Sequence, residues 1–154
     1  MKKTFFLLSF ILLTIGVVNA QSRQSVFAEV GGQGMSFTLN YDMRFYDAPE
    51  GPGFRIGGCY MKTSKVDFLR VPIVINYLIG QDGKFFEVGA GATIGNSEIM
   101  DSGSNTVGTL CFGYRVQPAD GGLTYRVALT PYFTVGSNSV FIPYFGGVSI
   151  GYCF

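Results

Sequence analysis

The residue types in this chain argue against catalysis. Its 154 residues include serines, cysteines and carboxylates but no histidine. A Ser or Cys nucleophile usually needs a neighbouring general base of suitable pKa, and no convincing Ser–Lys arrangement replaces the missing His. Because the roles of an active site cannot be filled, the sequence predicts a protein that is not an enzyme and carries no cofactor.

Three cysteines are the next candidates for chemistry: Cys59, Cys111 and Cys153. A zinc site needs several Cys or His ligands, and the chain has neither His nor a close Cys pair. The strands expected below place the three on non-adjacent strands and at different heights, whereas a disulfide needs Cα atoms within about 7 Å. We therefore expect small, inward-facing free thiols and no metal site.

Charged side chains are the remaining candidates. Eight of them share one face of the segments described below. They are Glu29, Asp42, Arg44, Arg55, Arg70, Glu87, Arg115 and Arg126. Acids and arginines that share a narrow interior can line a gated pore, or they can neutralise one another as an ion-pair plug. The choice between the two depends on the elements that position them.

The first twenty residues have the pattern of an export signal, which is set apart from the fold. Two lysines follow Met1, residues 5–18 are apolar, and small residues precede a cleavage site after Ala20. The apolar run is too short for a spanning helix, which needs about 20 residues. We expect a cleaved signal peptide over residues 1–20 and one barrel domain over residues 21–154.

Composition and charge narrow the class of protein. Without the two signal lysines the net charge changes from 11 − 10 = +1 to 9 − 10 = −1, so the basic surface that nucleic-acid binding requires is missing. Charged residues are only 14% of the chain and aromatic residues are 16%. No apolar run after Ala20 is long enough for a membrane helix, and a closed β-barrel is the other structure that satisfies its backbone in a membrane.

From Gln21 onward the hydrophobic pattern has a period of two, which is the period of a β-strand. Residues 35–45 show it most clearly, because apolar side chains from Phe37 to Phe45 alternate with polar side chains from Ser36 to Arg44. Turn residues divide the chain into eight such segments. They lie near residues 24–31, 34–45, 53–62, 66–79, 84–95, 106–116, 122–133 and 141–154.

These segments predict an all-β fold, an eight-stranded antiparallel up-and-down transmembrane β-barrel. Each has, or nearly has, the roughly 9–11 residues that a tilted membrane strand needs. The connections near 46–52, 80–83 and 117–121 are short, whereas those near 96–105 and 134–140 are longer and polar. With both termini in the periplasm, this is the asymmetry of short turns and longer external loops in outer-membrane barrels.

Bulky apolar residues are expected outside this barrel, with charged residues and glycines inside. The outward set is Ile56, Tyr60, Val71, Ile73, Ile75, Tyr77, Phe86, Val88, Leu110, Phe112, Tyr114, Tyr125, Val127, Leu129, Val148, Ile150, Tyr152 and Phe154. Aromatic rings at strand ends are expected to form interfacial girdles. These are Phe45, Tyr60, Tyr77, Phe85, Tyr132, Phe141 and Tyr144. Pro72 cannot donate a ladder hydrogen bond, so it predicts a bulge or distortion.

The short turns bring inward charges together. A hairpin centred on the first turn places Asp42 nearly opposite Arg55, and the last short turn places Arg126 beside Arg115. These residues would lie in the periplasmic half of the lumen.

The longest hairpin, centred near residue 101, places Glu87 opposite Arg115, while Glu29 and Arg70 would lie nearer the external end. We favour the ion-pair plug over the pore because the lumen of eight strands is just wide enough for side chains to fill.

Several stretches of the chain resemble the small eight-stranded outer-membrane barrels of the OmpA-transmembrane and OmpX kind. They are FRIGGCY (54–60), VPIVINYLIG (71–80), FFEVGAGAT (85–93), GYRVQPADGGLTYRVALTP (113–131) and PYFGGVSIGYCF (143–154). The resemblance covers most of the chain after residue 20 and extends to uncharacterised Gram-negative barrels. The last strand, with Tyr152 and the terminal Phe154, looks like the signal read by the barrel-insertion machinery. The resemblance implies a location in the cell outer membrane rather than a reaction.

We therefore expect a non-enzymatic outer-membrane barrel with a structural or surface-interaction role. Its partners would be outer-membrane lipids, the insertion machinery and an unidentified extracellular ligand of the loops near 31–34, 62–66, 96–105 and 134–140, with no nucleic acid. A narrow transport or small-ligand-binding barrel is the alternative. A soluble periplasmic lipid carrier, with its apolar face inside, is the third class.

Overall fold

The structure, a computed structural model, describes residues 23–62, 67–95, 106–134 and 140–154. Its ten strand segments form one sheet. They are β1 (Gln24–Gly31), β2 (Ser36–Arg44), β3 (Gly51–Lys62), β4 (Asp67–Gln81), β5 (Lys84–Gly95), β6 (Thr106–Val116), β7 (Gly122–Leu129), β8 (Tyr132–Phe133), β9 (Phe141–Ile142) and β10 (Gly146–Cys153). The signal peptide expected over residues 1–20 lies outside the described residues, as does the loop expected over 96–105.

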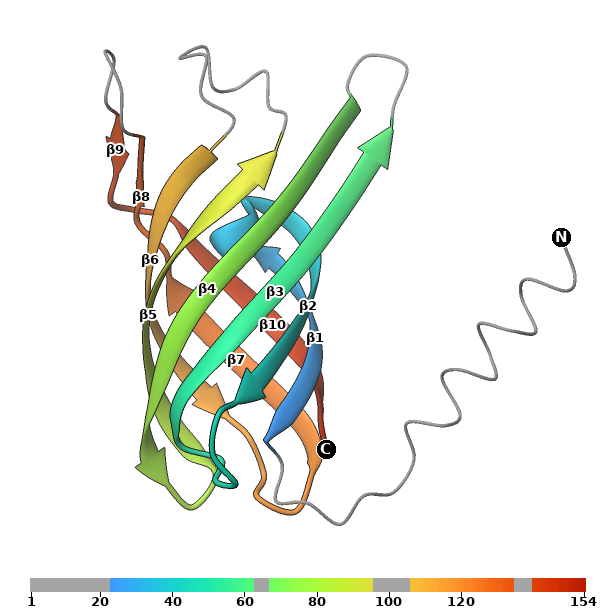
Figure 1. The fold of residues 1–154 in the computed structure, drawn as a ribbon, viewed down its shortest axis with the longest axis vertical. Coiled ribbons are helices and arrows are strands. Elements are labelled where there is room, and N and C mark those ends of the chain that lie inside the picture. Colours follow the sequence, from blue (N-terminus) through green and yellow to red (C-terminus); the bar gives the residue numbers. More distant parts are fainter. Residues whose placement is uncertain (1–22, 63–66, 96–105, 135–139) are drawn as a thin grey trace, which may run out of the picture.

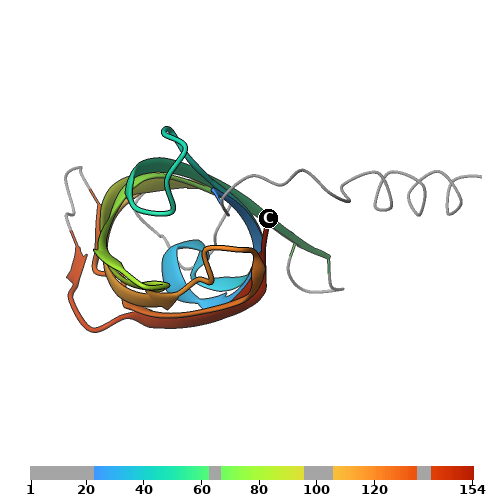
Figure 2. The same ribbon diagram turned by 90° about the horizontal axis from the view of Figure 1, so that it is seen from below.

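The sheet closes into a barrel, because β1 pairs with β10 and β5 pairs with β6. Segment β8 continues the line of β7, and β9 leads into β10, so the wall is the predicted eight-stranded antiparallel barrel (Figure 1). Figure 2 shows the ring of strands end-on. The short turns and the C-terminus lie at one end, here called the turn end, and the opposite end is the loop end. Within the described ranges, no helix is long and apolar enough to cross a membrane.

The two walls of the barrel differ in height. Strands β3 to β6 have 11 to 15 residues, whereas β1, β2, β7 and β10 have 8 or 9. The extra residues of β3 and β4 project beyond the rim at the loop end (Figure 1). The short wall has close to the minimum length of a tilted membrane strand.

Apolar side chains cover the outside of the barrel, which is the sidedness that the sequence predicted. Ile150 is 53% exposed and Phe112 is 52% exposed, whereas the neighbouring inward residues Ser149 and Cys111 are buried. Every member of the outward set is exposed or half-exposed. The period of two in the sequence therefore becomes the inside and outside of one closed sheet.

The prediction of a distortion at Pro72 is confirmed. The β3–β4 ladder is interrupted where Gly57 and Gly58 lie opposite Pro72 and Val71, and the same register resumes on both sides of the gap. On its other side Pro72 pairs in register with Thr93. The missing N–H therefore breaks the ladder toward β3 only, without inserting a bulge residue.

The prediction of an external contact loop near residues 31–34 is wrong. A single turn of 3-10 helix, η1 (Gly32–Gly34), folds into the lumen, and all three of its residues are buried. Gly32 has φ 58°, and a Cβ at this position would overlap the carboxylate of Glu29. Only glycine fits this close approach, which lets the turn enter the barrel.

Candidate functional site

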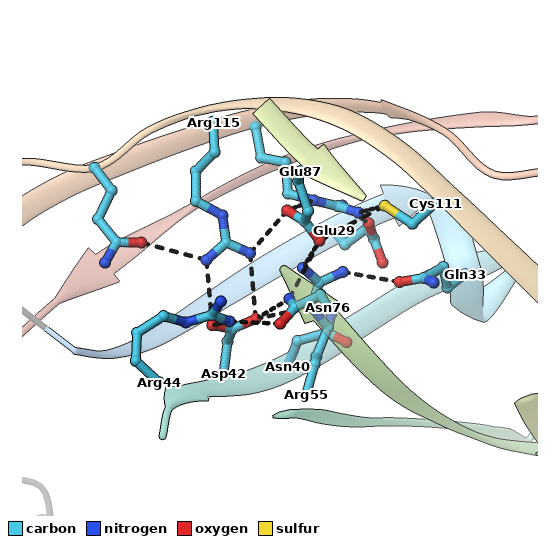
Figure 3. A network of polar contacts seen from close by, with 12 residues as sticks. Glu29, Gln33, Asn40, Asp42, Arg44, Arg55, Asn76, Glu87, Cys111 and Arg115 are labelled. Carbon is cyan, nitrogen blue, oxygen red and sulfur yellow. Dashed lines mark hydrogen bonds and ion pairs between the residues drawn. The ribbon is translucent and has the colours of Figure 1, made fainter. Parts of the chain in front are cut away.

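The structure places all eight charged residues predicted for the lumen inside the barrel, each at most 5% exposed. They come from seven different strands, β1 to β7. Seven of them form one connected network of ion pairs and hydrogen bonds (Figure 3). The eighth, Arg70, lies nearer the loop end, where its Nη1 donates to the carbonyl of Gly34 at 3.3 Å.

Asp42 is the first acidic centre of the network. Its Oδ1 accepts from Arg44 Nη2 at 2.5 Å and from Arg115 Nη1 at 3.2 Å. Its Oδ2 accepts from Arg115 Nη2 at 3.2 Å, from Arg55 Nε at 3.3 Å and from Asn76 Nδ2 at 2.7 Å. One carboxylate therefore balances three guanidinium groups.

Glu87 is the second acidic centre. Its Oε2 accepts from Arg115 Nη2 at 3.0 Å and from Arg126 Nε at 2.9 Å. Its Oε1 accepts from Arg55 Nη2 and, at 3.3 Å, from Asn76 Nδ2. Arg55 and Arg115 thus bridge the two carboxylates, and the network acts as one electrostatic unit rather than as separate pairs.

The register explains how these residues meet. Asp42 pairs directly with Arg55 across β2 and β3, and Arg115 pairs with Arg126 across β6 and β7. The expected pairing of Glu87 with Arg115 is wrong in register, because Arg115 lies opposite Phe85. The ion pair forms nevertheless, since the long Arg side chain reaches the inward neighbour two residues along β5.

Arg126 extends the network toward the loop end. Its Nη1 pairs with Glu29 Oε1 at 2.5 Å, and its Nη2 lies 2.9 Å from Cys111 Sγ. Cys111 and Cys153 are buried, Cys59 is partly exposed, and none of the three forms a disulfide. The thiol of Cys111 is thus a polar neighbour of the ion pairs rather than a separate site.

Sequence reasoning missed several neutral members of the site. The ring of Phe27 lies 5.0 Å from the Arg55 guanidinium carbon and 5.8 Å from that of Arg115, within the range of cation–π contacts. Gln117 accepts from Arg115 Nη1 at 3.2 Å. Both residues have the inward parity of their strands, so the period of two could have found them.

The η1 turn closes the network toward the loop end. Gln33 Oε1 accepts from Arg55 Nη1 at 2.8 Å, and the Gln33 carbonyl accepts from Thr93 Oγ1 at 2.5 Å. The carbonyl of Gly32 accepts from the hydroxyl of Tyr132. Side chains of β5 and β8 therefore hold the backbone of a loop that comes from between β1 and β2, and Arg55 of β3 holds its Gln33 side chain.

Two residues expected in the aromatic girdles also face the lumen. Phe85 is 1% exposed and Tyr132 is 2% exposed, so the girdle prediction is wrong for both. Phe45, Tyr60, Tyr77, Phe141 and Tyr144 are exposed. Phe85 shares the inward parity of Glu87, and Tyr132 donates its hydroxyl inside the barrel, so the alternation along the strand decides their sides.

The side chains of the network pack closely and leave no room for water between them. A gap bordered by Phe27, Arg115, Thr124, Arg126 and Ser149 leaves no volume that a water molecule could enter. A Cβ on Gly53 would overlap the guanidinium of Arg44, so the inward glycine provides room for the long side chain. The described part of the chain contains no cluster of His, Cys, Asp or Glu able to hold a metal ion.

Tyr152 and Phe154, the residues of the expected insertion signal, lie at the end of the chain. Tyr152 is 56% exposed on the outer face of β10. The backbone of Phe154 exchanges two hydrogen bonds with Gln24, at 3.1 and 2.8 Å, which ties the last residue to the first strand.

Comparisons with known proteins identify the fold. No family model matches the chain, and no curated protein sequence matches it. Among solved structures, the N-terminal β-barrel domain of Pseudomonas aeruginosa OprF matches with a TM-score of 0.57 and 12% identity, over 85% of this chain and 95% of that domain. This chain has the fold of a small outer-membrane β-barrel. The outer membrane enzyme PagL matches with a TM-score of 0.47 and 20% identity, over 84% of this chain and 96% of PagL.

Proposed function

We propose that the protein is exported through a cleaved signal peptide and is inserted in the cell outer membrane as a closed, non-enzymatic barrel. Its role is structural or in surface interaction, and its lumen is plugged by the ion-pair network. The distribution of side chains carries this proposal. A ring of exposed apolar residues surrounds buried charges, and such an arrangement is stable where lipid and not water contacts the wall.

The plug is supported by how densely the two central carboxylates are paired. Each of the two central carboxylates accepts from three arginines, and Arg55 and Arg115 are held by both. A charge removed from water is stabilised only when it is paired and hydrogen-bonded, so opening the bore would uncover several arginines at once.

A narrow transport barrel is the second candidate, and the charge balance of the network favours it. Arg44, Arg55, Arg115 and Arg126 face three acids, Glu29, Asp42 and Glu87. This leaves a formal excess of one positive charge in the network, and Arg70 adds a second to the lumen, so an opened bore would favour anions.

Membrane insertion is tested by fractionation of cells that express the full chain, followed by carbonate extraction. The barrel is expected in the extracted membrane pellet, and the folded protein is expected to migrate faster on gels before heating than after. A soluble product would contradict the proposed location. Deletion of Phe154 is expected to reduce the folded, membrane-inserted fraction if the last strand is read by the insertion machinery.

Planar-bilayer recordings with the purified, folded barrel test the plug separately. We expect no steady conductance above the unmodified bilayer. A large steady conductance with anion selectivity would replace the plug with the transport alternative while leaving the membrane location intact.

A further inference from the structure

A groove of about 750 Å³ crosses the outer face of the barrel, from the taller strands β5 and β6 to the shorter strands β7, β10 and β1. Its exposed walls are mainly apolar. The wall residues include Val88, Phe112, Val127, Leu129 and Val148. The one charged residue at its border, Glu87, directs its carboxylate into the lumen. The accessible surface of the groove is therefore mainly apolar and suits hydrocarbon.

Small residues at particular positions of the sequence create the groove. Gly146 occupies an outward position opposite Leu129, where a side chain would otherwise cover the wall. The floor is formed by the backbone at Gly113, Ala128 and Gly147, which lie side by side in register across β6, β7 and β10. Phe86 and Tyr114 also line the groove, and their rings stand edge to face with centroids 5.5 Å apart.

We propose that this groove binds one acyl chain of a membrane lipid. The inference rests on the proposed membrane location, because the groove is continuous with the apolar outer face. Hydrocarbon that fills a concave apolar surface gains dispersion contacts on several sides, whereas a chain against a convex wall gains them on one.

A second copy of the barrel fits this surface less well. A two-fold dimer brings the same patch of both partners together, and two concave grooves placed face to face would enclose a void. Stable interfaces also bury about 800 Å² per partner with close packing, so the groove would work against such a contact.

The absence of Trp from the chain allows a single reporter. In detergent micelles, Phe86→Trp places the reporter in the wall of the groove, and Phe54→Trp places it on the outer face of β3. A phospholipid brominated on its acyl chains is then titrated into the micelles. Tryptophan at position 86 is expected to be half-quenched at an about tenfold lower lipid mole fraction than tryptophan at position 54, a ratio that about ten extra atom contacts would supply.

A matched pair of substitutions tests the groove itself. Val127→Phe fills it, whereas Val26→Phe adds the same group at an exposed position of β1 outside it. The first is expected to abolish the tenfold difference and the second to preserve it. Equal quenching of both reporters, or no effect of Val127→Phe, would overturn the proposal. So would a cross-linked dimer that Val127→Phe dissociates, because a second copy would then occupy the groove.

Gel migration before and after heating is measured for each variant, so that unfolded samples are recognised. A barrel that folds and inserts but shows no preferential quenching contradicts the lipid site alone. A chain that stays soluble contradicts the proposed location as well.

Discussion

The turn end and the loop end of the lumen are filled in different ways. Toward the turn end, strand side chains meet as charges, with Asp42 and Glu87 each surrounded by three arginines. Toward the loop end, a piece of backbone fills the space, and the carbonyls of Gly32, Gln33 and Gly34 accept from side chains of the wall. Arg55 joins the two regions, because it binds both carboxylates and the side chain of Gln33.

The ion-pair network and the inward turn require different residues in the sequence. An ion-pair network needs charges at alternate positions of many strands, and it loses stability when any one charge is removed. A turn folded inward needs small residues and a tolerated backbone conformation, and it is sensitive to shape. The two regions should therefore respond to opposite kinds of substitution.

The largest effect is expected from Glu87→Gln. This change leaves Arg55, Arg115 and Arg126 each without one of the two acids that it pairs with, and it should lower the free energy of unfolding by about 4 kcal/mol. The measurement is urea unfolding of the barrel in lipid vesicles. Glu50→Gln, on an exposed turn, is the control and should unfold like the parent. Equal behaviour of the two variants would show that the network does not stabilise the turn end.

Placing a charge at position 33 tests whether the net positive charge of the network affects stability at the loop end. Gln33→Lys adds a positive charge beside Arg55 and should destabilise the barrel by about 3 kcal/mol in the same urea assay, since close like charges cost several kcal/mol. Gln33→Glu brings the acids to four against four arginines and should stay within about 1 kcal/mol of the parent. If the two variants were equally unstable, shape rather than charge would govern the position of Gln33.

At the neighbouring Gly32, we expect the shape of the side chain and not its charge to determine the effect of a substitution. Gly32→Ala introduces a left-handed alanine, with φ 58°, whose Cβ would displace the carboxylate of Glu29. Gly51→Ala is the matched control, because Gly51 has φ 92° and no atom within 4 Å of an added Cβ. We expect a loss of about 1 kcal/mol for Gly51→Ala from backbone strain alone, and about 2 kcal/mol for Gly32→Ala. Equal losses of stability in the two variants would mean that the Glu29 side chain can move away from the added Cβ at little cost.

The sequence predicts which side of a strand a residue faces better than it predicts the register of a long hairpin. Residues of one strand alternate between its two sides whatever their partners are, so the inward set and the facing of Asp42 and Arg55 followed from the pattern and a short turn. The longest hairpin is different. It is centred one residue earlier than expected, which moves Arg115 opposite Phe85, and nothing in the composition of a long polar connection fixes its centre.

The inward turn could not be predicted from its own residues. Gly31, Gly32 and Gly34 suit an exposed turn as well as a buried one, and only the donors of other strands decide between them. The sides of Phe85 and Tyr132 differ from the prediction for another reason. Their alternation with Glu87 and Thr130 places them in the lumen, whereas the girdle prediction depends only on ring type and position near a strand end. In this barrel the strand parity takes precedence.

The smallest effect is expected outside the lumen, where an ion pair of the same chemical type is exposed to water. Arg23 pairs with Asp47 at the turn end, with side chains 38% and 86% exposed. Asp47→Asn should change the free energy of unfolding by less than about 1 kcal/mol, because water already solvates both charges. Repeating the urea titration in 1 M salt should remove even this difference, since surface charges are then screened, while the effect of Glu87→Gln should persist. A salt-insensitive loss in Asp47→Asn would mean that burial is not what separates the two kinds of ion pair.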